Sequence, residues 1–396
     1  MVRFSRGSIV TWFSSITVLA SAFFLSPVAQ AEKTAEVGSV YFSSTYEQAR
    51  NKFLQSAKAA GASIESYPHP LTGPDGRALY IDLAYLGPEN VDAVLVLGSG
   101  THGVEGFAGS AIQTGLLQEG IAGRIPHGVG LMMIHAINPY GFAHTRRVNE
   151  DNVDLNRNFL DHTQPYPENP EYEELARVAA PKSLSMWENL RARLSVYWYV
   201  LKGGELKLRK AISQGQYTHP KGLFFGGNKP AWSNVTLTEI IKRRLSRTKR
   251  VMVVDFHTGL GEYGEAEIIM NVPREAPEYE RAMSCWGEKV RTTVQGESVS
   301  VDIRGPLKLA IPPMLPHTEV TAVSLEFGTV PVADVFWALR AENWLHHYGT
   351  DEHQDKVKIK AELLHVFYPD DIGWKRAVWR KGRSAVDEAM KCLLTD

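Results

Sequence analysis

Residues 94–109, VLVLGSGTHGVEGFAG, join an apolar run to a glycine-rich turn. An apolar run that ends at glycines is typical of a strand buried on both faces of a parallel sheet. The glycines have the G-x-G-x-x-G spacing of a dinucleotide-binding loop. The same segment contains His102 and Glu105, which have the H-x-x-E spacing of two metal ligands. These two interpretations exclude each other, and they predict different functions.

The dinucleotide interpretation lacks its second element. A dinucleotide site needs an acidic residue at the end of the next strand, about 20 positions further on, to hold the ribose hydroxyls. The next predicted strand, residues 129–139 (VGLMMIHAINP), has no acidic residue at its tip. The H-x-x-E spacing is also weak alone, because chance supplies about one such pair in a chain of this size. The metal interpretation therefore depends on the rest of the sequence.

Further apolar runs alternate with predicted helices along the chain. This alternation predicts an α/β fold with a single mixed, mostly parallel sheet and helices on both faces. In such folds ligands bind at the carboxyl ends of the strands, where residues 99–105 lie. The runs predicted as strands are residues 78–87, 91–100, 129–139, 250–259, 266–272 and 322–330.

Composition is ordinary for a globular protein, with 396 residues, 44% hydrophobic and 22% charged. The formal net charge of −1 argues against nucleic-acid binding, which needs a basic excess or stripe. We expect residues 1–31 to be a signal peptide. Residues 32–396 are then one catalytic domain with a helical insertion at about 165–249.

The first residues have the layout of a secretory signal. Arg3 and Arg6 precede an apolar stretch at Ile9–Leu25, and small residues at Ala29 and Ala31 form a cleavage site. We therefore expect a periplasmic or secreted protein without stable membrane insertion after cleavage. An uncleaved N-terminal anchor is the alternative, because the apolar stretch nearly reaches spanning length.

The two cysteines, Cys285 and Cys392, are far apart in the sequence. In an exported protein they can pair, although two cysteines do not make a disulfide framework. Neither has a second cysteine nearby, so a cysteine-type zinc site is excluded.

Two later strands supply the groups that a metal site needs. His257 ends the strand VVDFHTG, and Glu326 lies in the apolar strand SLEFGTV. A lone histidine at a strand end is more often structural. With His102 and Glu105, however, His257 completes a two-histidine, one-glutamate set that leaves a zinc position open. A buried glutamate is costly unless it is paired or functional, so Glu326 is the candidate general base.

The most specific stretch is residues 137–159, INPYGFAHTRRVNEDNVDLNRNF. It contains an N-P-x-G turn, an arginine and a D-x-N-R-N-F motif. Together with the order of the other motifs, it resembles the carboxypeptidase A-like zinc metallopeptidases over roughly residues 94–330. The resemblance is closest to a poorly characterised bacterial branch near the succinylglutamate desuccinylase and aspartoacylase-like amidohydrolases.

The resemblance implies a role for each matching residue. His102, Glu105 and His257 would bind one Zn²⁺ per chain. Glu326 would take a proton from the attacking water and pass it to the leaving amine. Arg147 would stabilise the oxyanion, although its neighbour Arg146 stays an alternative.

The D-x-N-R motif implies substrate contacts. Asn156 and Arg157 would hold the free carboxylate of the substrate, because a guanidinium meets a carboxylate bidentately. Asp154 would accept a hydrogen bond from the ring of His102, which fixes its tautomer. Asp255 lies two positions before His257 and can act in the same way or make an ordinary structural pair.

Other conspicuous residues fit the site less well. We expect His135 to pack in the core, and Trp198 and Tyr199 to pack in the core or to line the wall of a pocket. We expect His317 and Glu319 to lie in a loop outside the site. The carboxypeptidases carry a mobile tyrosine shortly before the base, and residues 301–317 contain none. The identity of the substrate is therefore open even though hydrolysis is implied.

We expect an exported zinc hydrolase that cleaves a C-terminal peptide or related amide bond beside a free carboxylate. An amidohydrolase of small N-acyl amino acids uses the same chemistry and is the first alternative. A non-catalytic exported binding protein with the same fold is the second. The sequence does not indicate an oligomeric state.

Overall fold

The structure is a computed structural model that describes residues 40–350 and 352–394. The predicted signal peptide lies outside the described residues. Eight strands form one sheet in the order β1-β2-β4-β3-β5-β8-β6-β7. They are β1 (Ser63–Thr72), β2 (Ala78–Leu86), β3 (Ala93–Ser99), β4 (Val129–His135), β5 (Arg250–Thr258), β6 (Ala266–Met270), β7 (Val290–Thr292) and β8 (Glu319–Phe327).

The centre of the sheet is parallel and its flanks are mixed. Strands β4, β3, β5 and β8 run parallel to one another, as do β6 and β7. The pairs β1–β2, β2–β4 and β6–β8 are antiparallel. This arrangement confirms the predicted single mixed, mostly parallel sheet. The carboxyl ends of the central strands β3 and β5 consequently lie side by side.

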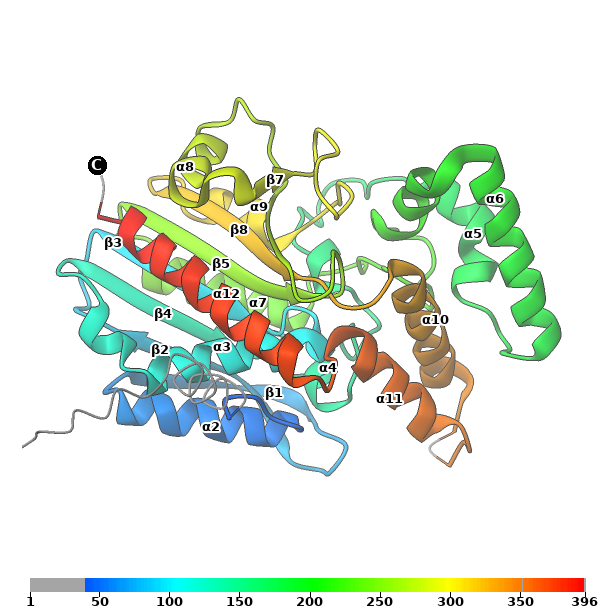
Figure 1. Ribbon diagram of the computed structural model, residues 1–396, viewed down its shortest axis with the longest axis horizontal. Coiled ribbons are helices and arrows are strands. Elements are labelled where there is room, and N and C mark those ends of the chain that lie inside the picture. The colour runs from blue at the N-terminus through cyan, green and yellow to red at the C-terminus, as the bar shows by residue number, and fades with distance from the viewer. Residues whose placement is uncertain (1–39, 351, 395–396) are drawn as a thin grey trace, which may run out of the picture.

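Helices cover both faces of the sheet, as the alternation of elements predicted (Figure 1). Alternate residues of the central strands serve the two faces: Leu95 and Leu97 belong to one core cluster, Val94 and Val96 to the other. The first cluster packs under α2 (Tyr46–Ala59), α3 (Gly106–Gln118), α8 (Pro277–Trp286) and α12 (Ile372–Cys392). The second packs under α7 (Trp232–Leu245) and α9 (Leu307–Met314).

Four more helices extend from one end of the sheet. Helices α5 (Pro170–Ala179) and α6 (Met186–Ser213) project beyond α10 (Val332–Tyr348) and α11 (Lys356–Phe367), at the right of Figure 1. Helix α6 changes direction at Gly204, whose φ of 81° is not helical. The segment 165–249, which we predicted as a helical insertion, thus places α5 and α6 in this projection and α7 on the sheet.

Short helical segments complete the fold. They are η1 (Gly103–Glu105), η2 (Ile121–Arg124), α4 (Pro139–Ala143), η3 (Leu155–Arg157) and η4 (Gly287–Lys289). Of these, η1 and η3 contain predicted site residues. Within the described ranges no helix is both long and apolar enough to cross a bilayer.

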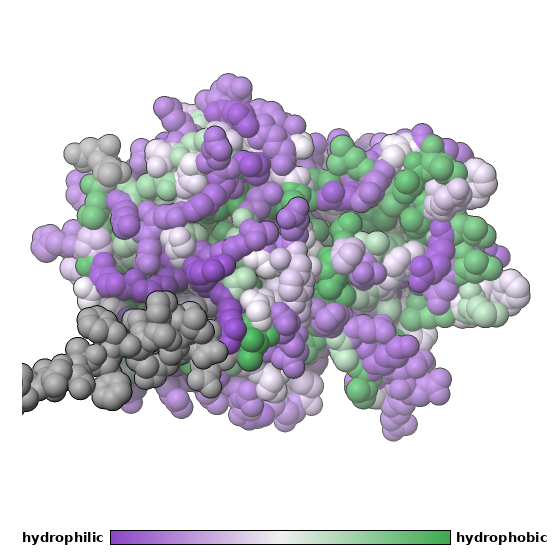
Figure 2. Space-filling view, in the orientation of Figure 1, coloured by the Kyte–Doolittle hydropathy of each residue, from purple (hydrophilic) through white to green (hydrophobic). Residues whose placement is uncertain are grey.

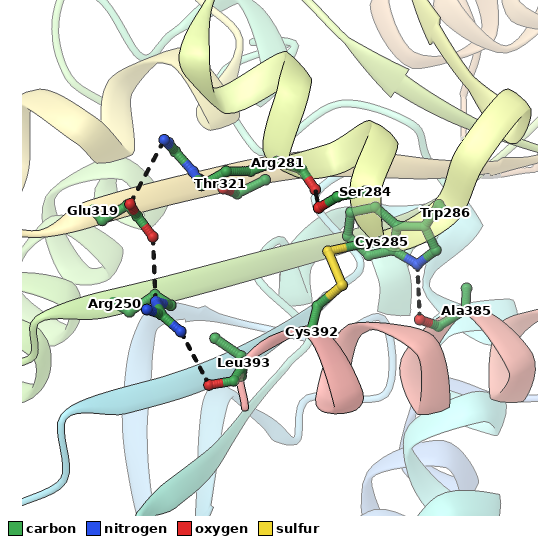
Figure 3. The surroundings of a disulfide bond; sticks show 10 residues. All are labelled: Arg250, Arg281, Ser284, Cys285, Trp286, Glu319, Thr321, Ala385, Cys392 and Leu393. Carbon is green, nitrogen blue, oxygen red and sulfur yellow. Dashed lines mark hydrogen bonds and ion pairs between the residues drawn. A yellow bond between two sulfur atoms is a disulfide. The ribbon is translucent and has the colours of Figure 1, made fainter. Parts of the chain in front are cut away.

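Cys285 and Cys392 form a disulfide that joins the end of α8 to the end of α12 (Figure 3). Their Cα atoms are 5.6 Å apart, and the bond closes a sequence separation of 107 residues. Beside it, Trp286 Nε1 donates a hydrogen bond of 3.0 Å to the Ala385 carbonyl. The pairing that the sequence left open is therefore present, and it ties the C-terminal helix to the edge of the sheet.

Candidate metal centre

His102, Glu105 and His257 meet at the carboxyl ends of β3 and β5. Their potential ligand atoms all lie within 4.8 Å of one another, and all three residues are buried. His102 Nδ1 is 2.9 Å from Glu105 Oε1, and His257 Nδ1 is 3.2 Å from Glu105 Oε2. The two Nδ1 atoms are 3.2 Å apart. The three predicted ligands therefore converge on one point.

The H-x-x-E turn is held in place by its glycine. A Cβ atom on Gly103 would lie 2.1 Å from the Gly141 carbonyl carbon, so only glycine permits this approach. The Gly103 N–H donates to Arg147 O at 3.0 Å, and the Val104 N–H donates to Arg146 O at 2.8 Å. Asn138 caps the N-P-x-G turn by accepting from the Gly141 N–H. The two sequence motifs thus form one packed unit.

Both histidines also contact an aspartate through Nε2. His102 Nε2 lies 3.1 Å from Asp154 Oδ1, and His257 Nε2 lies 2.7 Å from Asp255 Oδ2. Thr101 Oγ1 donates to the Asp255 carboxylate. A neutral imidazole that donates its Nε2–H to a carboxylate leaves Nδ1 free to bind a metal, and Arg147 Nη2 also lies 2.9 Å from His102 Nε2. The open question about Asp255 is answered in favour of the histidine contact.

The charges around the ligands keep the carboxylates ionised. Burial alone would raise the pKa of Glu105, but His102 and Arg147 hold it well below its usual range. Burial likewise opposes ionisation of Asp154, yet Arg157 and Arg147 hold its pKa well below the usual value. Two imidazole nitrogens and an ionised carboxylate form a donor set that fits a transition-metal ion with an open coordination position.

Glu326 lies directly opposite His257, because residues 257 and 326 pair in the register of β5 and β8. The residue is 8% exposed, and the Leu260 N–H donates to its Oε1 at 3.0 Å. Burial and the nearby Glu105 carboxylate raise the pKa of Glu326 to about 8. A carboxyl group with a pKa near neutrality can both accept and return a proton, which a general base must do.

Arg146 and Arg147 point in different directions. Arg147 Nη1 lies 2.5 Å from Glu105 Oε1 and its Nε lies 3.2 Å from Asp154 Oδ2. Arg147 also lines the cavity beside the ligands. Arg146 is 2% exposed and pairs with Glu342 at 2.8 Å, and it is not among the residues that line this cavity. Of the two candidates, Arg147 is the one in the site.

Asn156 and Arg157 line the same cavity. Arg157 Nε and Nη2 donate to the Ser213 carbonyl at 3.1 and 2.5 Å, which links the site to the end of α6. Asn156 Oδ1 accepts from the Leu307 N–H at 3.0 Å. This bond uses the acceptor atom of the Asn156 side chain, and its donor group is the Nδ2 amide.

The cavity has a volume of about 400 Å³. One cation in it was not singled out from the sequence. Lys308 is buried, and its Nζ donates to Ile269 O at 2.9 Å and to Ser324 Oγ at 3.1 Å. Burial lowers the pKa of Lys308 to about 8. The available signal was a single charged residue in the apolar segment GPLKLAIPPM. The apolar wall comes from α6 and α10, including Val196, Val200, Val332, Val335 and Phe336.

The remaining sequence expectations divide into two groups. His135 is fully buried, stacks on Phe53 and contacts Ser110 Oγ at 2.9 Å, which confirms a core role. Glu319 lies at the start of β8, at the far end of the strand from Glu326, and pairs with Arg250 at 3.2 Å. It is therefore outside the site, as expected, but it begins a strand and does not lie in the predicted loop.

The core prediction for Trp198 is wrong, since this side chain is 59% exposed. Tyr199, its neighbour on α6, is only half-buried. The reason is that α6 projects beyond the sheet, so little packs against its outer side (Figure 1).

The sequence matches the family described as "Protein of unknown function (DUF2817)" over residues 42–381. The chain belongs to this family. Among curated proteins, none matches the sequence significantly.

Several solved structures resemble this fold at low identity. Bovine thrombin-activatable fibrinolysis inhibitor, solved with a tick carboxypeptidase inhibitor, has a TM-score of 0.49 and 10% identity, with 89% of this chain and 97% of that chain covered. Carboxypeptidase A from Helicoverpa armigera has a TM-score of 0.43 and 13% identity, with 85% and 80% covered. Succinylglutamate desuccinylase from Chromobacterium violaceum has a TM-score of 0.36 and 15% identity, with 81% and 74% covered. These proteins come from the two groups that the sequence motifs resemble. Because their TM-scores are below 0.5, we draw no functional argument from them.

Proposed function

We propose that the protein is a zinc-dependent hydrolase that cleaves a C-terminal peptide or related amide bond beside a free carboxylate. The observation that carries this proposal is the register pairing of His257 with Glu326. It places a buried carboxyl group with a raised pKa beside a two-histidine, one-glutamate cluster. This is the combination that metal-assisted amide hydrolysis requires.

His102, Glu105 and His257 are the residues that would hold zinc. Their nitrogen and oxygen donors suit zinc, and three protein ligands are typical of catalytic rather than structural zinc sites. Bound there, zinc polarises the scissile carbonyl and lowers the pKa of water to about 7. Asp154 and Asp255 each contact the Nε2 atom of one imidazole, which orients the two rings for this role.

Glu326 moves the proton in this proposal. The Leu260 N–H holds its Oε1, which leaves Oε2 to accept a proton from the attacking water. The same carboxyl then donates that proton to the amide nitrogen as the C–N bond breaks. A pKa raised by burial and by Glu105 supports both halves of the transfer.

Four basic side chains line the cavity, and they favour an anionic substrate: Arg147, Arg157, Arg209 and Lys308. Arg147 lies against the ligands, where its guanidinium can stabilise negative charge that develops on the carbonyl oxygen. Arg157 and the Asn156 amide are placed to bind the substrate carboxylate, and Lys308 adds a further positive charge. Because the cavity holds only about 400 Å³, a small N-acyl amino acid is the second candidate substrate.

We also infer that the protein is exported, to the periplasm or out of the cell. The Cys285–Cys392 disulfide supports this, because disulfides persist mainly in oxidising compartments. The N-terminal residues with the layout of a signal peptide support it independently.

The test compares the wild-type protein with Glu326→Gln and His257→Ala. We expect about one zinc per chain in wild type and Glu326→Gln, and loss of zinc in His257→Ala. Glu326→Gln should lower kcat/KM by at least about 10³-fold on a panel of peptides and N-acyl amino acids. Amidation of the substrate carboxylate should abolish turnover by the wild-type protein.

Two results would contradict the proposal. Unchanged turnover in Glu326→Gln would remove the base from the mechanism. A protein that binds zinc and these compounds but hydrolyses none of them would instead be a binding protein with the same fold.

A further inference from the structure

Helix α6 presents a row of large apolar side chains to solvent. Each member of this row is between 46% and 73% exposed. Figure 2 shows hydrophobic colouring over the end of the molecule where α5 and α6 lie. We call this row the α6 stripe. It consists of Met186, Trp187, Leu190, Leu194, Tyr197, Trp198 and Leu201.

The stripe is one continuous face of the helix. At 100° per residue its members fall within an arc of about 120°. Ala192, Val196 and Val200 lie on a second face, whose centre is about 140° from the centre of the stripe, and the last two line the cavity described above. Helix α6 is therefore apolar on two sides, one packed inward and one facing solvent. A folded protein rarely leaves such a contiguous apolar patch without a function.

The charge of α6 differs from that of the whole chain. The helix has six lysines and arginines but only two acidic residues, whereas the chain has a net charge of −1. On the helical projection Arg191 and Lys202 lie along one border of the stripe, and Arg193 lies along the other. Both borders of the stripe thus carry basic side chains, although Arg191 also pairs with Glu188 at 3.1 Å and the Arg193 guanidinium lies 4.7 Å from the centre of the Trp337 ring.

We propose that α6 docks the protein on the surface of an anionic lipid membrane. Tryptophan and tyrosine are favoured at the interface between lipid and water, and the stripe contains Trp187, Tyr197 and Trp198. Basic residues beside an apolar face bind anionic headgroups, which the borders of the stripe provide. Docking in this way places the apolar side chains at the boundary of headgroups and acyl chains.

A second copy of the chain fits this surface less well. In a two-fold pairing the same surface meets itself. Because both borders of the stripe are basic, each positive border would then face another positive border. An anionic membrane offers the opposite charge instead.

Docking has a consequence for the cavity. Val196 and Val200 belong to the same helix as the stripe but line the cavity on the other side. A membrane bound to the outer face of α6 would therefore lie one helix diameter, about 10 Å, from the apolar wall of the cavity. The protein would act on molecules close to the lipid surface.

The first experiment measures binding to vesicles of phosphatidylcholine with and without phosphatidylglycerol. One variant combines Leu190→Ser, Leu194→Ser and Trp198→Ser, and a second combines Arg191→Glu and Lys202→Glu. The matched control combines Lys242→Glu and Arg247→Glu, which changes the net charge equally on exposed residues in and just after α7. All proteins carry the same N-terminal segment, so its contribution is common to the set. Circular dichroism and thermal unfolding verify that each variant is folded.

We expect the wild-type protein to prefer the anionic vesicles. The first variant should lose at least about twentyfold in partition coefficient, since burial of apolar side chains is removed. The second should lose about tenfold or more, because each basic residue near the surface contributes about a factor of five. The control should change by less than about threefold.

The second experiment locates the contact. An environment-sensitive fluorophore on Leu194→Cys should shift to the blue with anionic vesicles. The same label on Val357→Cys, an 81% exposed position on α11, should not shift. Equal responses at both positions, or equal vesicle binding by all variants, would overturn the proposal. So would a lipid-free dimer that the serine substitutions dissociate, because the stripe would then be a subunit interface.

Discussion

Glu342 and Glu326 are two buried carboxyl groups near the Arg146–Arg147 dipeptide, and their surroundings shift their pKa values in opposite directions. Glu342 lies on α10, and one of its carboxylate oxygens is 2.8 Å from Arg146 Nε and 2.8 Å from Lys360 Nζ. Burial would raise its pKa, but these two cations lower it to about 2. Glu326 has the Leu260 N–H as a hydrogen-bond donor, and burial together with Glu105 raises its pKa to about 8.

The difference shows how burial serves two purposes in one protein. A buried carboxylate in contact with two cations stays ionised and fixes the elements that supply them. Here the carboxylate on α10 is joined to a lysine on α11 and to an arginine in the turn that follows α4. A buried carboxyl group beside another carboxylate destabilises its own charge and can therefore exchange protons. Glu342 therefore has a structural role, and Glu326 has the properties of a group that exchanges protons.

The largest expected effect tests the structural role of Glu342. Glu342→Gln should lower the free energy of unfolding by about 3–5 kcal/mol, because it leaves the buried Arg146 and the partly buried Lys360 without their carboxylate. Urea denaturation measures this loss. The control is Glu362→Gln on α11, whose side chain is 52% exposed and lies 3.9 Å from Lys358. It should cost less than about 1 kcal/mol, and equal losses would show that Glu342 is not specially placed.

The pH dependence of Glu342 is the next largest effect. A carboxyl group whose folded-state pKa is lowered stabilises the protein above its unfolded pKa, and this contribution disappears as the pH falls. For Glu342 the window runs from about 4.5 down to about 2. The difference in unfolding free energy between wild type and Glu342→Gln should therefore shrink by about 3 kcal/mol across it. A constant difference from pH 5 to pH 2 would contradict the assignment.

Glu326 should show the reverse sign. Its folded-state pKa is raised, so its contribution to stability is complete below about 4.5 and is lost as the pH rises through about 8. In chelator-treated protein, Glu326→Gln should be more stable than wild type by roughly 1–3 kcal/mol at pH 9. At pH 5 the two should be close to equal. Thermal unfolding at both pH values measures this difference. A variant less stable than wild type at pH 9 would contradict the raised pKa of Glu326.

The smallest effect separates the two cations of Glu342. Lys360→Met keeps the length of the side chain and leaves Arg146 in contact with the carboxylate. It should cost about 1–2 kcal/mol, less than Glu342→Gln, because one charge-assisted contact is lost while the other remains. Urea denaturation of both variants in the same buffer gives the ranking, and a larger loss for Lys360→Met would reverse the interpretation.

The strands of the sheet and the cluster of residues at their ends could be predicted from the sequence better than the packing around that cluster. Buried strands are visible because their apolar runs end at glycines, and His102, Glu105 and His257 follow such runs directly. Parallel strands bring their carboxyl ends together, so residues far apart in the chain could be assigned to one cluster.

The sequence could not separate Arg146 from Arg147. Their directions depend on the irregular turn before them, where Thr145 has a φ of 49°. Nor could it predict the exposure of Trp198, because an apolar residue on a projecting helix has the same sequence pattern as one in the core. Lys308 was missed for a related reason: its burial results from the packing of α9 on the sheet. In each case the outcome depends on what packs against the residue.

Because His257 pairs with Glu326 across two strands, the sheet sets the distance between these two residues. Main-chain hydrogen bonds hold adjacent strands about 4.8 Å apart, and these two residues lie directly opposite each other on β5 and β8. In the proposed reaction, the spacing between a metal ligand and the base is thus set by backbone geometry that side-chain replacement elsewhere leaves unaltered. Loops, cavity walls and α6 can diverge to suit new substrates while this distance stays constant.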